Sequence, residues 1–163
     1  MKFEIVELSE FSGTIASVYS VWVNDSDTTL FDQFVVENKS KYLDEISSII
    51  DRIEIIGHRT GAREHFFKHN EGTSGDGICA LYDSPDRKLR LYCIRYGSTC
   101  IILGGGGSKN VRALQDDEKL KQENYLLRQI SNAITDALKE GDLYWIENGK
   151  KLEGKYIFDE EIP

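Results

Sequence analysis

Three strand-like segments follow one another closely in the middle of this chain, and they constrain its fold more than any other feature. The segments are 78–82, 88–96 and 99–103, and each is rich in β-branched, aromatic and other apolar residues. The connections between them, Ser84-Pro85-Asp86 and Gly97-Ser98, are too short to contain a crossover helix. The sequence therefore predicts an antiparallel meander at the centre of the fold.

Strands and helices are also expected before the meander. Segments 2–8 and 14–23 are strand-like and are joined by a turn at Ser12-Gly13, which predicts an N-terminal hairpin. Apolar residues then recur every three or four positions over 28–56, with an interruption near 38–40, which indicates two helices. Asp27 is the expected N-cap of the first helix, and Gly57 is the expected stop of the second.

A long amphipathic helix is predicted over 115–140, ending at Gly141. Two further strand-like runs, 143–147 and 155–158, flank an Asn-Gly pair that favours a hairpin turn. The expected fold class is therefore α+β. An antiparallel sheet, made of the meander and the N-terminal hairpin, packs with the N-terminal helices and one long C-terminal helix.

The length of 163 residues fits a single domain, 1–163. We expect a core over about 28–140, with the hairpin 1–24 and the tail 142–163 as additions. The first residues have no apolar signal segment, and no apolar run approaches the 20 or so residues of a membrane span. Three cysteines lie in apolar stretches, which predicts buried, reduced thiols in a cytoplasmic protein without a membrane contact.

All three histidines lie in the glycine-rich segment 57–77. His65 and His69 are four residues apart, a spacing that places two imidazoles on one face of a helix and would suit a metal. No cysteine is near, and the His-Glu-x-x-His pattern is absent, so we expect no metal and no cofactor. A solvated polar loop is the main interpretation, and contact with RNA or another anion, which would include Arg63, is the alternative.

The middle strand of the meander has two unlike faces. Lys88, Arg90 and Tyr92 alternate with apolar residues, so they lie on one face, and Arg95 lies on the other. We expect the apolar face to cover the core and the basic, aromatic face to be open to solvent.

Four glycines and then Ser108-Lys109 follow the third strand. A phosphate-binding loop requires Gly-Lys-Ser/Thr at the start of a helix, and here the serine precedes the lysine. The sequence therefore predicts a flexible loop over 104–110, at the edge of the sheet, which would still let the Lys109 ammonium reach a ligand beside the strands.

The span from about 77 to 138 resembles the RelE/HigB-like superfamily of toxin–antitoxin ribonucleases. The resemblance is carried by Ala80-Leu81-Tyr82, by 88–94 (Lys-Leu-Arg-Leu-Tyr-Cys-Ile), and by 100–105 (Cys-Ile-Ile-Leu-Gly-Gly) followed by Lys109. The family has an Arg-containing strand, an apolar strand, a glycine loop with lysines and a C-terminal helix, and helices precede its sheet. This chain departs from the pattern by having one lysine after the loop and no phenylalanine in it.

The resemblance implies metal-independent cleavage of mRNA, which in many members of the family takes place on the ribosome. It also implies an antitoxin protein that inhibits the enzyme. No contact of the toxin itself with DNA is expected. Arg90 matches the strand arginine and would bind the phosphate, Lys109 would stabilise its charge, and Tyr92 would stack a base or move a proton. Further RNA contacts are expected from Lys88, Arg95, Arg112 and Arg63.

The charge distribution bears on this expectation. The whole chain carries −8, an unusual balance for a general nucleic-acid binder. Residues 84–112 nevertheless carry six cations and one carboxylate, a local +5 within a remainder of −13. A compact phosphate site fits that distribution. The alternative is a non-catalytic α+β module, such as a degenerate toxin relative, that binds protein through its sheet.

Overall fold

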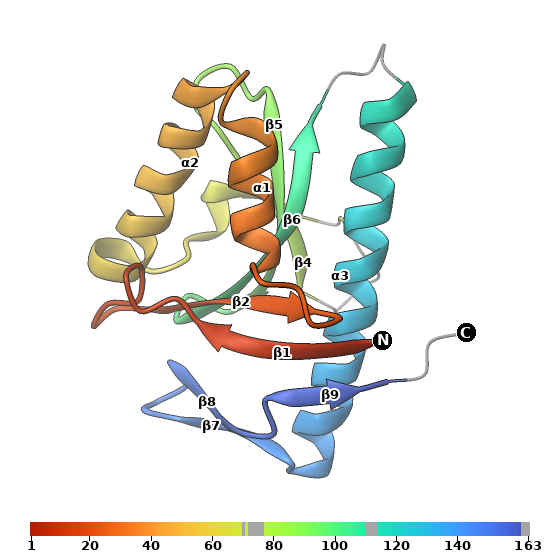
Figure 1. The fold of residues 1–163 in the computed structure, drawn as a ribbon. Coiled ribbons are helices and arrows are strands. Elements are labelled where there is room, and N and C mark those ends of the chain that lie inside the picture. The colour runs from red at the N-terminus through yellow and green to blue at the C-terminus, as the bar shows by residue number, and fades with distance from the viewer. Residues whose placement is uncertain (70, 72–76, 110–113, 161–163) are drawn as a thin grey trace.

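A computed structural model describes residues 1–69, 71, 77–109 and 114–160, and the side chains of 114–116 are left out of the description. One seven-stranded sheet lies between two helical layers, with α1 and α2 on one face and α3 on the other (Figure 1). The strand order is β3-β4-β5-β6-β2-β1-β9, and every neighbouring pair is antiparallel except β2 and β6. The predicted α+β class is confirmed.

The meander consists of β4 (Ile78–Tyr82), β5 (Leu89–Tyr96) and β6 (Cys100–Ser108), paired as predicted. The third strand is longer than expected, because Gly106 pairs with Leu91 and Gly107 pairs with Arg90. The prediction of a flexible loop was therefore wrong for residues 104–108. Glycine suits this strand because a Cβ would collide with the Leu127 side chain at Gly104, with the Glu123 side chain at Gly105 and with the Arg90 backbone carbonyl at Gly106.

The N-terminal hairpin is also confirmed, with β1 (Lys2–Glu7) paired to β2 (Ser17–Val23). β2 also runs parallel to β6, which merges the hairpin and the meander into one sheet. The buried Ser20 hydroxyl donates to the carbonyl of Leu103 at 2.7 Å and accepts from the backbone N–H of Phe31 at 3.2 Å. This one side chain therefore ties β2 to β6 and to the first turn of α1.

Helix α1 (Leu30–Asn38) begins at Thr29, whose hydroxyl accepts from the N–H of Asp32, so the predicted N-cap Asp27 was two residues early. Helix α2 (Leu43–Ile55) continues as a π-helical turn, η1 (Ile56–Thr60), and does not stop at the predicted Gly57. The chain turns away at Gly61, whose φ of 78° is a left-handed conformation that glycine adopts without steric cost. A 3₁₀ turn, η2 (Glu64–Phe66), and the short edge strand β3 (Phe67–Lys68) follow.

Helix α3 (Leu114–Glu140) is the predicted long helix, and its apolar stripe packs on the sheet face opposite α1 and α2. Tyr92 and Ile94 belong to the core beneath α3, while Leu91 and Cys93 belong to the core beneath α1 and α2. The prediction that the basic, aromatic face of the middle strand is open to solvent was therefore wrong. Both faces of β5 are covered, because the chain supplies an apolar helix for each.

The tail forms a hairpin and returns to the sheet. β7 (Leu143–Ile146) pairs with β8 (Lys151–Gly154) around the Asn148-Gly149 turn, so the expected partner run 155–158 was wrong. Instead β9 (Ile157–Asp159) adds to the edge of β1, where Phe158 stacks on Phe3 with ring centroids 4.5 Å apart. No helix in the described part of the chain has the length and apolar character to cross a bilayer.

The side chains of all three cysteines are buried in the core, and this burial lowers their reactivity. Burial raises the pKa of Cys93 well above its ordinary value, and burial likewise raises the pKa of Cys100. Since the thiolate is the reactive species, we expect the folded protein to resist a thiol-specific disulfide reagent at pH 8, and to react at all three cysteines in guanidinium. Fast labelling of Cys93 or Cys100 in the folded state, followed by mass spectrometry, would contradict this.

Candidate functional site

The candidate site is built around Arg90 in β5. Arg90 and Tyr92 are two residues apart in the strand and therefore share one face. Tyr82 of β4 lies opposite Arg90 in the register of the two strands. The guanidinium donates from Nη1 to the Tyr92 hydroxyl at 3.5 Å and from Nη2 to the Tyr82 hydroxyl at 3.3 Å. The sheet thus brings one cation and two phenols together.

Glu71 supplies the counter-ion of Arg90, with 3.7 Å between Glu71 Oε1 and Arg90 Nη1. The two side chains are only 13% and 10% exposed, so water screens the pair weakly. Lys68 lies 3.4 Å from the same carboxylate, and the Asn124 amide on α3 donates to the Glu71 carbonyl at 2.7 Å. Glu71 is therefore held between the edge of the sheet and α3.

Lys109 follows the end of β6, where its N–H donates to the carbonyl of Lys88 at 2.8 Å. The positive charge of Arg90 lowers the pKa of Lys109, and burial and the charge of Lys68 lower it further. Lys109 therefore lies within the field of Arg90, at the same end of the sheet. Arg90, Lys109 and Lys68 thus act on one another electrostatically, and Glu71 is the carboxylate that pairs with Arg90 and Lys68.

The pKa values of Arg90 and Tyr92 show which protonation states the cluster holds. Burial lowers the pKa of Arg90, but its hydrogen bond to Tyr92 and the nearby Tyr82 and Glu71 outweigh burial, and the net pKa is raised. Burial raises the pKa of Tyr92 despite the opposing effect of Arg90. At neutral pH the cluster therefore contains a guanidinium and a neutral phenol, which are both hydrogen-bond donors.

Two buried atoms of the cluster have no hydrogen-bond partner among the described residues, namely Nε of Arg90 and Oε1 of Glu71. Buried polar atoms are normally hydrogen-bonded, so Nε of Arg90 has an unused donor that a ligand could fill. Glu71 Oε1 makes its contacts as ion pairs, with Arg90 and Lys68. A guanidinium binds two oxygens of a phosphate at once. A phosphate at Arg90 would compete with the Glu71 carboxylate and free it to accept a proton.

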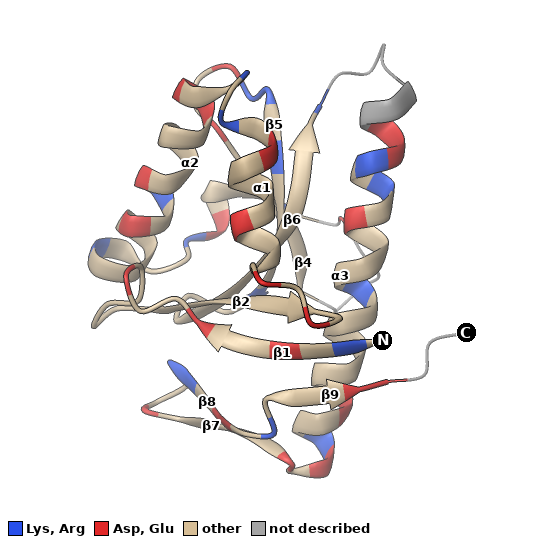
Figure 2. Cartoon of the chain, in the orientation of Figure 1, with Lys and Arg blue, Asp and Glu red and all other residues tan. Residues whose placement is uncertain are grey.

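Figure 2 places these groups in the charge pattern of the whole molecule. Lys and Arg lie at the end of the sheet where β5 begins and β6 ends, and Asp and Glu lie in the adjoining loop, over the helices and on β1. Of the cations between 84 and 109, Arg87, Lys88, Arg90 and Lys109 lie at or beside that end, whereas Arg95 lies near the other end of β5.

The other predicted RNA contacts are dispersed. Lys88 lies 3.5 Å from Glu45 and 3.8 Å from Asp86 and is half exposed. Arg95 is on the opposite face from Arg90, as its alternation predicted, and its Nε donates to the Ala62 carbonyl at 2.8 Å. Arg63 is exposed in the segment before η2, and Arg112 lies outside the described residues. The structure therefore does not bring Lys88, Arg95 and Arg63 together at Arg90.

The histidines do not converge. His69 Nε2 lies 2.7 Å from the Glu64 carbonyl, and His65 packs against Phe66 with ring centroids 4.5 Å apart. Within the described ranges, no three His, Cys, Asp or Glu side chains are grouped closely enough to hold a metal ion.

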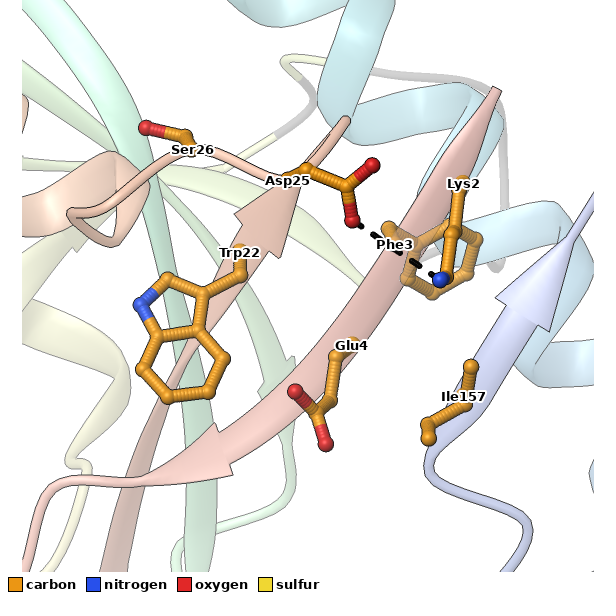
Figure 3. A pocket seen from close by; sticks show the side chains of 7 residues that line it. All are labelled: Lys2, Phe3, Glu4, Trp22, Asp25, Ser26 and Ile157. Carbon is orange, nitrogen blue, oxygen red and sulfur yellow. Dashed lines mark ion pairs between the residues drawn. The ribbon is translucent and has the colours of Figure 1, made fainter.

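A separate cavity of about 270 Å³ lies at the other end of the sheet order (Figure 3). Trp22, Glu4 and Ile157 stand in one row across β2, β1 and β9, because the strand register sets Glu4 opposite both of the others. Lys2 lies 3.7 Å from Asp25 beside the row. β6 lies between the strands of this cavity and β5, and the cavity lining contains none of the predicted site residues.

No protein-family model matches this chain. Comparisons with curated proteins and with solved structures likewise found no match. The arrangement around Arg90 is therefore the basis for inferring what the protein does.

Sequence reasoning identified Arg90, Tyr92 and Lys109, and it missed Glu71 and Tyr82. Tyr82 could have been found, because a short connection between two antiparallel strands fixes which residue lies opposite Arg90. Glu71 lies in the glycine-rich segment, and its position carries no periodic signal.

Proposed function

We propose that this protein is a metal-independent endoribonuclease that cleaves mRNA, a RelE/HigB-like toxin whose site is centred on Arg90. One observation carries the proposal. Arg90, Tyr92 and Lys109, which the sequence marks out separately, gather at one end of the sheet, where a buried carboxylate and a second phenol join them. A cytoplasmic location, an antitoxin protein as partner, and action on ribosome-bound mRNA belong to the same proposal.

The cluster contains the groups that this cleavage needs. A ribose 2′-hydroxyl attacks the adjacent phosphate, a bond from the 2′-oxygen to phosphorus forms, and the bond to the 5′-oxygen breaks. Arg90 binds the phosphate oxygens, and the displaced Glu71 carboxylate accepts the 2′-hydroxyl proton. Lys109, whose pKa the charge of Arg90 lowers, donates a proton to the departing 5′-oxygen. Tyr92 remains a neutral donor to the phosphate.

The burial of the same residues favours one alternative function. As whole residues, Arg90 and Tyr92 are 8% and 3% exposed. A largely buried ion pair between β5 and the segment after β3 is also compatible with a structural role. In that case the protein is a non-catalytic α+β module that acts by binding another protein.

A cleavage assay separates the two functions. Single-stranded RNA labelled at its 5′ end is incubated with the protein and EDTA, with and without ribosomes. We expect fragments that end in a 2′,3′-cyclic phosphate, and about a 100-fold lower rate for Lys109→Met, since general acid catalysis contributes on that order. Lys109 is exposed, so its replacement leaves the core intact.

The matched control is Lys139→Met, an exposed lysine in the last turn of α3 with the same change of charge. It is expected to cleave as the wild type does. Intact RNA under both conditions, or equal loss of rate in both lysine variants, would overturn the ribonuclease proposal and leave the non-catalytic module.

A further inference from the structure

A cavity of about 420 Å³ opens beside the Arg90 cluster, between α2, the turn η2 and the ends of β3 and β4. Its lining contains two arginines, a lysine, a histidine and aromatic rings, contributed by Arg52, Arg87, Lys68, His65, Phe66 and Tyr82. Such a combination of cations and flat rings is what a nucleotide, with its phosphate and its base, requires.

The cavity is positively charged. Asp83 is the carboxylate in its lining. Asp83 is buried, and its Oδ1 accepts a hydrogen bond from the backbone N–H of Leu89 at 2.7 Å. Neither Arg52 nor Arg87 lies within 4.0 Å of a described carboxylate. The two guanidinium groups therefore keep their charge available to an anionic ligand.

Both guanidinium groups are arranged against aromatic rings. The Arg52 guanidinium carbon lies 4.2 Å from the centroid of the Phe66 ring, and that of Arg87 lies 5.6 Å from the centroid of Tyr82. Contact with a ring face restrains each long side chain, so less conformational entropy is lost when it binds a phosphate. Phe66 and Tyr82 remain partly exposed, which leaves ring surface for a base.

Tyr82 joins this cavity to the proposed catalytic cluster. Its ring centroid lies 5.6 Å from the guanidinium carbon of Arg87 and also 5.6 Å from that of Arg90. One side chain thus borders both positions. A single nucleic-acid strand could place one phosphate at Arg90 and an adjoining nucleotide in the cavity.

We propose that this cavity is a nucleotide subsite, which binds the RNA nucleotide next to the one whose phosphate lies at Arg90. Arg87 and Arg52 bind its phosphate, and the base stacks on Phe66 or Tyr82. The identification of the ligand as RNA rests on the proposed function. A free nucleotide also has a phosphate beside a flat ring, so it could bind in the same way. The experiment below therefore distinguishes RNA from a free nucleotide.

The test measures binding without cleavage. The probe is a fluorescent hexaribonucleotide with 2′-O-methyl groups, which lack the attacking hydroxyl, and affinity is followed by anisotropy over a range of salt concentrations. Arg87→Met removes an exposed guanidinium that forms no described ion pair, and Arg59→Met is the matched control from outside the cavity. We expect Arg87→Met to weaken binding about 10-fold, and to reduce the slope of log affinity against log salt by about 0.7. Arg59→Met is expected to bind as the wild type does.

Two competitors, inorganic phosphate and adenosine monophosphate, identify the ligand. Competition only by the mononucleotide at millimolar concentration supports the subsite, because both ring and phosphate are then needed. Equal competition by inorganic phosphate, absent binding of the hexanucleotide, or equal affinity of the two arginine variants would overturn it. If the wild type binds but does not cleave unmodified RNA, the ribonuclease proposal fails and the subsite stands.

Discussion

Replacing Arg90 with alanine is expected to lower the free energy of unfolding by about 3 kcal/mol. The reason is the carboxylate left behind. Glu71 is 13% exposed and has Arg90 3.7 Å away, so removing the guanidinium leaves a buried charge with only Lys68 as its described ion-pair partner. The Tyr82 and Tyr92 hydroxyls lose a donor at the same time. Urea denaturation followed by circular dichroism measures the change.

A double-mutant cycle separates the pair from its surroundings. Glu71→Gln and Arg90→Met are made singly and together, and the double variant replaces both charges with neutral groups of similar size. We expect it to be more stable than the sum of the single effects predicts, by about 1–3 kcal/mol, because neither charge is left buried alone. Strict additivity would show that Glu71 and Arg90 do not interact in solution.

The same double variant separates an effect on RNA cleavage from an effect on the stability of the fold. The double variant should fold and still fail to cleave RNA, since it has neither the phosphate-binding guanidinium nor the proposed base. A folded double variant with wild-type cleavage would place the active site elsewhere. Loss of stability alone therefore cannot be mistaken for loss of catalysis.

Local sequence pattern was sufficient for most of the strands and helices. The meander was predicted because its connections are short, and α3 was predicted because its apolar stripe keeps the helical period over 27 residues. The environment of β5 could not be predicted in this way. Tyr92 was predicted to lie on a solvent-facing side of the strand, and it is buried because α3 docks there, which no local pattern specifies.

In the candidate site, too, some contacts follow from local sequence pattern and others depend on the tertiary fold. Arg90 and Tyr92 share a face because strand alternation places them there, and that information is local. Glu71 pairs with Arg90, and its backbone carbonyl is held by the Asn124 amide on α3. Such a contact joins residues far apart in sequence, so the pairing of Glu71 with Arg90 required the three-dimensional structure.

The glycines of β6 lie against the backbone of β5, and replacing one of them is expected to have a large effect on stability. A Cβ on Gly106 would collide with the carbonyl oxygen of Arg90, and backbone cannot move aside without disturbing the pairing of β5 and β6. Gly106→Ala is therefore expected to destabilise the protein by about 3 kcal/mol, the upper end of the range for overpacked cores. Thermal and urea denaturation measure the loss.

Gly107→Ala is the matched control, one residue further along the same strand. Its Cβ would lie 3.3 Å from Cγ of Lys119 and 3.9 Å from a side-chain carbon of Leu120, and a lysine chain can shift by a few tenths of an ångström. We expect less than about 1 kcal/mol of destabilisation, because the contact is with a flexible side chain. Equal effects would mean that glycine is needed along the whole run for a reason other than the approach of β5. A large difference would show that Gly106 sets the position of the Arg90 backbone, and with it the geometry of the proposed site.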